Sequence, residues 1–237
     1  MQTMTNTSQT TMESVKQSVK DPVKNVELKP LLRGWIHLVT MPLAFAAALV
    51  LLILSPTAPT RWASAVYLLS TLLLFGMSAL YHRGRWSARA HAILRRIDHS
   101  NIFLLIAGTY TPLSVALLEP SDALTVLLIV WIGALVGIGT SIFWPTAPRW
   151  FTTPIYVILG WVAVWFLPQF WTAGGPAVVW LLISGGILYT LGALVYGFKW
   201  PDPSPKTFGF HEIFHSFTVA GWITHCVAAF IAVLSVG

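Results

Sequence analysis

Two histidines four residues apart, His211 and His215, stand at the start of the last apolar stretch of the sequence. On an α-helix, side chains four residues apart lie one above the other on the same face, so both imidazoles can point at one spot. Neutral imidazole nitrogens are good ligands for transition metals, and especially for zinc. The spacing therefore predicts two ligands of a metal site, whose remaining ligands must come from elsewhere in the chain.

We expect the third ligand to be His82, with Asp98 and Ser78 completing the site. Three imidazoles leave the fourth tetrahedral position of zinc for a water molecule, which is the arrangement of catalytic rather than structural zinc sites. A ligand set without cysteine and poor in oxygen favours Zn²⁺ over Ca²⁺ or Mg²⁺. Asp98 would act as the base for that water or orient a ligand. Ser78 lies one helical turn before His82, so its hydroxyl would reach the water or a substrate oxygen.

Each of these residues also has a simpler interpretation. A single histidine in a membrane helix is more often a hydrogen-bonded packing residue than a ligand. Ser78 could bond its own helix backbone, and Asp98 could pair with Arg95 or Arg96. An intramembrane carboxylate is costly, however, at about 2.5–3.5 kcal/mol on insertion scales, and it usually has a function. The metal hypothesis therefore depends on whether all these residues share one depth in the membrane.

The string from His211 to His215 also matches the H-E-x-x-H signature of soluble zinc proteases. We discount this match because His225 does not have the spacing of the third ligand in the extended motif. Glu212 would also turn about 100° away from His211 around the helix. Glu212 therefore stays as a reserve candidate for the base.

Four further histidines lie outside the predicted ligand set. His99 adjoins Asp98 and is an alternative ligand. Of the other three, His37 lies in the first apolar stretch, His91 lies between two stretches, and His225 lies ten residues beyond His215. They are assigned to packing or to loops: His37, His91 and His225.

The composition indicates an integral membrane protein. Of the 237 residues, 56% are hydrophobic and only 9% are charged, and the mean hydropathy is +0.72. A soluble domain of this length could not place so much apolar surface inside one core. The single cysteine, Cys226, excludes an intrachain disulfide. The net charge of +6 does not indicate nucleic-acid binding, because the charges lie between apolar stretches and form no basic face.

The predicted fold class is an all-α integral membrane protein, a bundle of seven transmembrane helices. Apolar stretches of the length needed to cross a bilayer occur at approximately 34–55, 61–82, 99–118, 123–143, 150–171, 176–198 and 208–236. Residues 1–30 are polar and lack a signal-peptide pattern, so they are predicted to be a flexible cytoplasmic tail ahead of a membrane domain over 31–237. Residues 83–97 fit either an amphipathic helix at the cytoplasmic interface or a basic loop.

The basic residues predict the orientation of the bundle. With the N-terminus in the cytoplasm and the C-terminus outside the plasma membrane, every lysine and arginine except Arg61 lies on the cytoplasmic side. Alternating spans then bring the end of the second helix, the start of the third and the start of the seventh to that same side. His82, Asp98 and the pair His211 and His215 therefore share one depth, which supports the metal hypothesis independently.

Three spaced motifs resemble the haemolysin III branch of the progestin and adipoQ receptor family. They are Ser78-Ala-Leu-Tyr-His82, Asp98 with the following Gly108-Thr-Tyr-Thr-Pro112, and His211-x-x-x-His215. The resemblance covers nearly the whole chain from about residue 30. It implies that the three histidines bind zinc and that Asp98 and Ser78 complete the site. Eukaryotic relatives are receptors linked to ceramide hydrolysis, the wider superfamily includes alkaline ceramidases, and the bare seven-span core here is similar to bacterial members.

Three functions are compatible with these observations. The first is a zinc-dependent, ceramidase-like hydrolase that cleaves an amide or ester in a membrane lipid, with the acyl chain held among the spans. The second is a non-catalytic sensor or receptor-like protein with a structural zinc. The third is a pore-forming haemolysin, although the sequence offers no charged lumen face outside the metal cluster. The substrate and the oligomeric state are left open.

Overall fold

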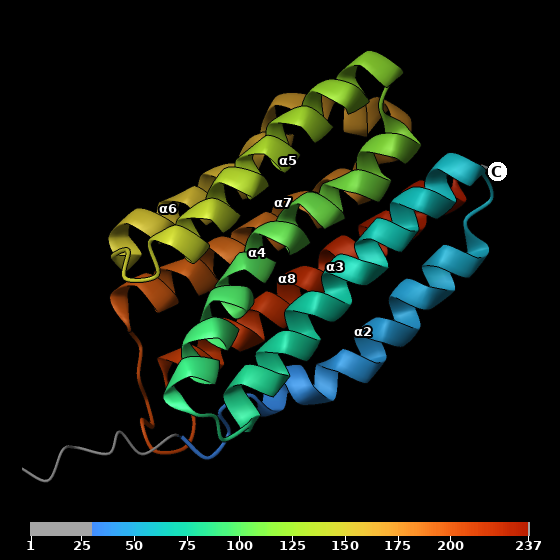
Figure 1. Cartoon of the computed structure of the whole chain (residues 1–237). Helices are drawn as coiled ribbons and strands as arrows, with labels where there is room; N and C mark the ends of the chain where they lie inside the picture. Colours follow the sequence, from blue (N-terminus) through green and yellow to red (C-terminus); the bar gives the residue numbers. More distant parts are fainter. Residues whose placement is uncertain (1–29, 237) are drawn as a thin grey trace, which may run out of the picture.

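The computed structural model describes residues 30–236, which fold into a bundle of helices (Figure 1). The helices are α2 (Trp35–Leu54), α3 (Ala58–Arg83), α4 (Ala88–Leu117), α5 (Pro120–Phe143), α6 (Arg149–Gly160), the 3-10 helix η1 (Trp161–Phe166), α7 (Leu167–Phe198) and α8 (Phe210–Leu234). Within the described range the only β-type pairing is an isolated bridge between Ser204 and Phe208. The all-helical prediction is therefore confirmed for these residues. The tail predicted for residues 1–30 lies, apart from Pro30, outside them.

The outer surface of the bundle suits a lipid environment. Large apolar side chains of α5 point outward, with Leu124, Ile132 and Leu135 each 58–62% exposed. A surface of this kind is unfavourable in water and favourable against hydrocarbon. Six helical segments of the described chain are long and apolar enough to cross a membrane: α2, α3, α4, α5, the continuous segment Arg149–Phe198, and α8. The chain is a membrane protein.

The segment Arg149–Phe198 runs for 50 residues and is interrupted twice. The first interruption is η1, where the Tyr110 hydroxyl of α4 donates to the Gly160 carbonyl at 2.7 Å and accepts from the Ala163 amide at 2.8 Å. These two bonds satisfy backbone groups at the point where the α-helical pattern changes. The second interruption is Gly175, whose φ of 76° and ψ of 177° are accessible essentially to glycine alone. The helix α7 therefore consists of two helical parts that meet at Gly175.

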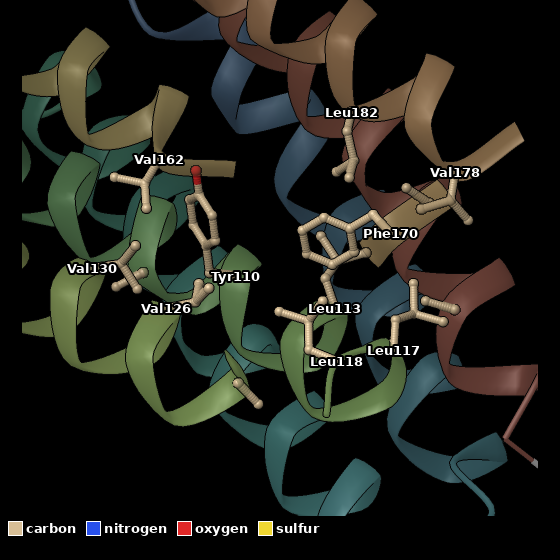
Figure 2. Packing of buried hydrophobic residues seen from close by; sticks show 14 of the residues in the cluster. Tyr110, Leu113, Leu117, Leu118, Val126, Val130, Val162, Phe170, Val178 and Leu182 are labelled. Atoms are coloured by element: carbon tan, nitrogen blue, oxygen red, sulfur yellow. The ribbon is translucent and has the colours of Figure 1, made fainter. Parts of the chain in front are cut away.

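Two helices occupy the middle of the bundle. The helix α4 packs against α3, α5 and α8, while α8 packs against α7, α4 and α2 (Figure 1). The larger core cluster is contributed mainly by α4, α5, η1 and α7. Figure 2 shows ten of its side chains by name: Tyr110, Leu113, Leu117, Leu118, Val126, Val130, Val162, Phe170, Val178 and Leu182. Close packing of these side chains fixes the positions of the helices that carry the polar residues discussed below.

The helix α4 begins at Ala88, eleven residues before the predicted start of the third span at residue 99. Its N-cap is Ser87, whose hydroxyl accepts from the Ala90 amide at 3.3 Å. Because no glycine or proline lies between Ala88 and Asp98, nothing stops the helix from continuing into the membrane. The loop interpretation is therefore wrong for residues 88–97, and only residues 84–87 form a connection between α3 and α4. The helical interpretation is right in type, but this helix is continuous with the membrane span.

Candidate metal centre

The start of α2, the end of α3 and the start of α8 lie together at one end of the bundle (Figure 1). The chain preceding α2 is tied to the chain preceding α8, because the Leu31 and Leu32 amides donate to the carbonyls of Lys206 and Thr207 at 3.0 and 3.2 Å. At Gly34, the N-cap of α2, φ is 80°. A Cβ atom at this position would lie 2.7 Å from the Cβ of His82. Glycine is therefore required here by both its conformation and its contact with α3.

We predict that Gly34→Ala destabilises the protein by about 1–2 kcal/mol from the positive φ alone, with a further cost from the contact with His82. The measurements are the melting temperature and metal content of detergent-purified protein, and both should fall. The matched control is Gly76→Ala in α3, where an added Cβ meets nothing within 4 Å and the higher helix propensity of alanine is favourable. Identical behaviour of the two variants would contradict the prediction.

The structure brings His82, His211 and His215 together, one histidine from α3 and two from α8. One ligand nitrogen from each lies within 4.8 Å of the others, and the Nε2 atoms of His82 and His211 are 3.2 Å apart. The ring centroids are 4.5–5.1 Å apart. His82 and His215 are buried, with 7% and 3% of their surfaces exposed. Three imidazoles that converge in this way could hold a metal ion.

The closest pair of ligand nitrogens has the spacing that a tetrahedral metal ion requires. Metal–nitrogen bonds of ~2.0–2.1 Å place neighbouring ligand nitrogens ~3.3–3.4 Å apart, close to the 3.2 Å between His82 and His211. Two imidazole nitrogens at this distance form at most one hydrogen bond in their neutral forms, whereas a shared cation would accept a lone pair from both. Imidazole nitrogen alone, without thiolate, suits zinc and neighbouring transition metals rather than calcium or magnesium.

Asp98 and Ser78 lie next to the three histidines. The Oδ2 atom of Asp98 is 3.7 Å from the Nε2 atom of His82, which is too long for a hydrogen bond. The Ser78 hydroxyl, on α3 one turn before His82, interacts with the Asp98 carboxylate. Both side chains line the same cavity as His215. The carboxylate therefore faces the space in front of the histidines and is held by the serine.

Glu212 is occupied by other partners. Its Oε1 atom accepts from the Arg33 guanidinium at 2.5 Å, and its Oε2 atom accepts from the Gly209 amide at 2.9 Å. The carboxylate is 1% exposed and serves as the N-terminal capping group of α8. This ion pair joins the start of α2 to the start of α8. Glu212 therefore has a structural role, and both of its oxygens are engaged rather than free to act as the base.

The remaining histidines of the described chain fall into two groups. His99 and His225 bond to backbone carbonyls away from the three ligands, at Arg95 and Leu182, and His91 packs against the Tyr81 ring. His37 is different, because its ring stacks on that of His215 at a centroid distance of 3.9 Å. This contact differs from the expectation that His37 serves packing alone. His37 begins the first apolar stretch, so the same depth argument that linked the other histidines would have placed it beside them.

A cavity of about 140 Å³ extends from this cluster into the bundle. On α4 its lining runs from Asp98 to Leu113, a distance of about 22 Å along a helix. The deeper wall is mostly apolar and includes Leu74, Leu167 and Phe170. A cavity of this volume and length is narrow. Its length would accommodate a hydrocarbon chain with a polar group at the end where Asp98 and His215 lie.

Comparisons with known proteins agree with the motifs. A family model described as "Haemolysin-III related" matches residues 26–226. A "Hemolysin-3 homolog" of Bacillus subtilis (strain 168) is 33% identical over 188 residues, covering 78% of this chain and 85% of that protein. A "Hemolysin-3" of Bacillus cereus is 36% identical over 166 residues, covering 70% of this chain and 72% of that protein.

Proposed function

This chain belongs to the haemolysin-III related family, a branch of the progestin and adipoQ receptor family, and we propose that it is a zinc-dependent hydrolase of a membrane lipid. The bond cleaved is an amide or an ester. The observation that carries the proposal is the position of the histidine cluster, Asp98 and Ser78 at one end of a long apolar cavity. A purely structural metal site would need neither the carboxylate facing the cavity nor the cavity itself.

We infer that the chain crosses the membrane seven times. A straight helix of 50 residues would be ~75 Å long, more than twice the ~30 Å of a bilayer core. The break at Gly175 divides Arg149–Phe198 into two parts, each long enough for one crossing. With seven spans, the distribution of the basic residues supports a cytoplasmic N-terminus, a histidine cluster on the same side and a C-terminus outside.

Each polar residue at this end of the cavity would have a separate role in the reaction. His82, His211 and His215 would hold the ion, from two helices that the core packing keeps in place. Zinc held there would supply Lewis-acid chemistry, polarising a carbonyl and making water nucleophilic near neutral pH. Asp98 would take up the proton of the attacking water and pass it to the leaving group. Ser78 would hold the Asp98 carboxylate in position and donate to a substrate oxygen.

The cavity supports a lipid as the substrate. Its apolar wall would hold an acyl chain and place the amide or ester next to Asp98 and the histidines, which would bring the reacting groups into a fixed geometry. Val164 lines the cavity and is also 42% exposed on the outer surface. This position supports entry of the chain from the bilayer through the wall that η1 forms.

The proposal is tested by lipid hydrolysis in proteoliposomes. Protein purified with its metal should release fatty acid from an N-palmitoyl lipid amide. Removal of the metal with a chelator should abolish the release, and one equivalent of Zn²⁺ per chain should restore it. His82→Ala should be inactive under all these conditions, while the control His91→Ala, on an exposed part of α4, should be as active as the wild type. Release that survives chelation or His82→Ala would contradict the proposal.

A further inference from the structure

His37 is a buried imidazole for which the protein provides no hydrogen bond. It is 3% exposed, and neither Nδ1 nor Nε2 has a hydrogen-bond partner among the residues that the structure describes. A neutral imidazole carries one donor and one acceptor, and buried polar atoms in proteins are nearly always paired. Two unpaired nitrogens on one buried ring therefore call for a partner that the described residues do not supply.

The ring of His37 is held firmly by aromatic neighbours. It stacks on His215 at 3.9 Å with an interplanar angle of 5°, and it meets the edge of Phe75 at 5.1 Å and 86°. Because the rings of His37 and His215 are parallel, His37 turns its face, rather than a nitrogen, toward its neighbour. It also stands outside the group of three histidines whose nitrogens converge. Packing fixes the ring, but it uses neither nitrogen.

The position of His37 indicates what the missing partner is. His37 lines the cavity together with Ser78, Asp98 and His215, at the polar end. A molecule that fills the cavity with a hydrocarbon chain would place its polar group beside this ring. An amide has both a hydrogen-bond donor and an acceptor, as a neutral imidazole does, so the two groups are complementary.

We propose that His37 is a substrate-binding residue that hydrogen-bonds the amide group of an acyl lipid at the metal end of the cavity. This inference rests on the proposed function for the identity of the ligand, but binding through His37 requires no turnover. An unpaired buried imidazole destabilises the ligand-free protein. His37 therefore lowers the stability of the protein but provides a hydrogen-bonding group for the ligand.

The test compares ligand affinity and stability in variants of the full-length, zinc-loaded protein in detergent. His37→Phe keeps an aromatic ring for the stack on His215 but removes both nitrogens, and His37→Gln restores a donor and an acceptor. The control is Ser114→Ala in α4, which removes a buried hydroxyl that also lacks a partner in the described chain but lies outside the cavity lining. The probe is palmitamide, measured by displacement of a pyrene-labelled fatty acid.

We expect His37→Phe to weaken palmitamide binding about tenfold, while its zinc content is unchanged and its melting temperature is equal to or above that of the wild type. His37→Gln should retain most of the affinity, and Ser114→Ala should bind as the wild type does. Equal affinity of His37→Phe and the wild type, or loss of zinc from His37→Phe, would overturn the inference. A wild type that did not bind palmitamide would overturn this inference together with the amide form of the proposed function, whereas lipid-ester hydrolysis is tested separately by the release assay.

Discussion

The Asp98→Asn variant should hydrolyse the lipid amide about 10²–10⁴-fold more slowly than the wild type, because a general acid–base group contributes a factor of this size. Asparagine has nearly the same shape as aspartate but cannot take up a proton. The carboxylate lies 3.7 Å from His82 Nε2, beyond hydrogen-bond distance, so the imidazoles do not depend on it for their positions. The Ser78 hydroxyl can still bond the amide oxygen of asparagine. Zinc content and melting temperature should therefore stay at wild-type values.

The measurement is kcat in proteoliposomes together with zinc content by elemental analysis. Ser78→Ala serves as the matched comparison, because it removes the group that holds Asp98 but leaves the carboxylate in place. Its rate should lie between those of the wild type and Asp98→Asn. An Asp98→Asn protein with an unchanged kcat would show that Asp98 does not transfer the proton. One that lost its zinc would place the carboxylate among the metal ligands.

The Arg33→Met variant should be destabilised by about 3–5 kcal/mol, because it leaves the buried Glu212 carboxylate without its counter-charge. Arg33 and Glu212 are 2.5 Å apart and join the start of α2 to the start of α8. Glu212 is 1% exposed, so water cannot replace the guanidinium. The same change loosens the end of the bundle that carries His211, and weaker zinc retention should accompany the loss of stability.

The control for this prediction is Glu212→Gln. Glutamine removes the charge and keeps one acceptor oxygen, which can accept from the Gly209 amide, while the Arg33 side chain, 21% exposed, can bond to water, so a smaller loss is expected. Both variants are compared by thermal melting in detergent and by the zinc retained after dialysis. Equal melting temperatures for Arg33→Met and the wild type would contradict a stabilising role for the ion pair.

Much of the fold followed from patterns that a single sequence displays. The apolar stretches gave the helices, because in a membrane every backbone group must be satisfied within its own segment. The four-residue spacing of His211 and His215, together with the shared depth of His82 and Asp98, predicted residues that the structure does place side by side. Helix geometry and the alternation of spans were sufficient for this step, since neither depends on details of packing.

Other features depended on packing and could not be predicted in this way. The pairing of Arg33 with Glu212 joins residues 179 positions apart, and no spacing rule links them. The continuity of the helix over residues 88–97 with the membrane span was not predicted, because its first turns are basic, although Ser87 is a recognisable cap. The role proposed for His37 rests on the lack of a hydrogen-bond partner for its two nitrogens among the described residues. Only the three-dimensional contacts reveal this.

The central claim is that three histidines from two helices hold one zinc ion. It is tested most directly by elemental analysis of detergent-purified protein prepared without chelators, with His82→Ala and the double variant His211→Ala/His215→Ala beside the wild type. We expect about one zinc per wild-type chain and almost none in either variant, because a site that loses a ligand holds the ion far more weakly. A wild type without zinc, or variants that bind as much zinc as the wild type, would contradict the assignment of the site and the hydrolase proposed from it.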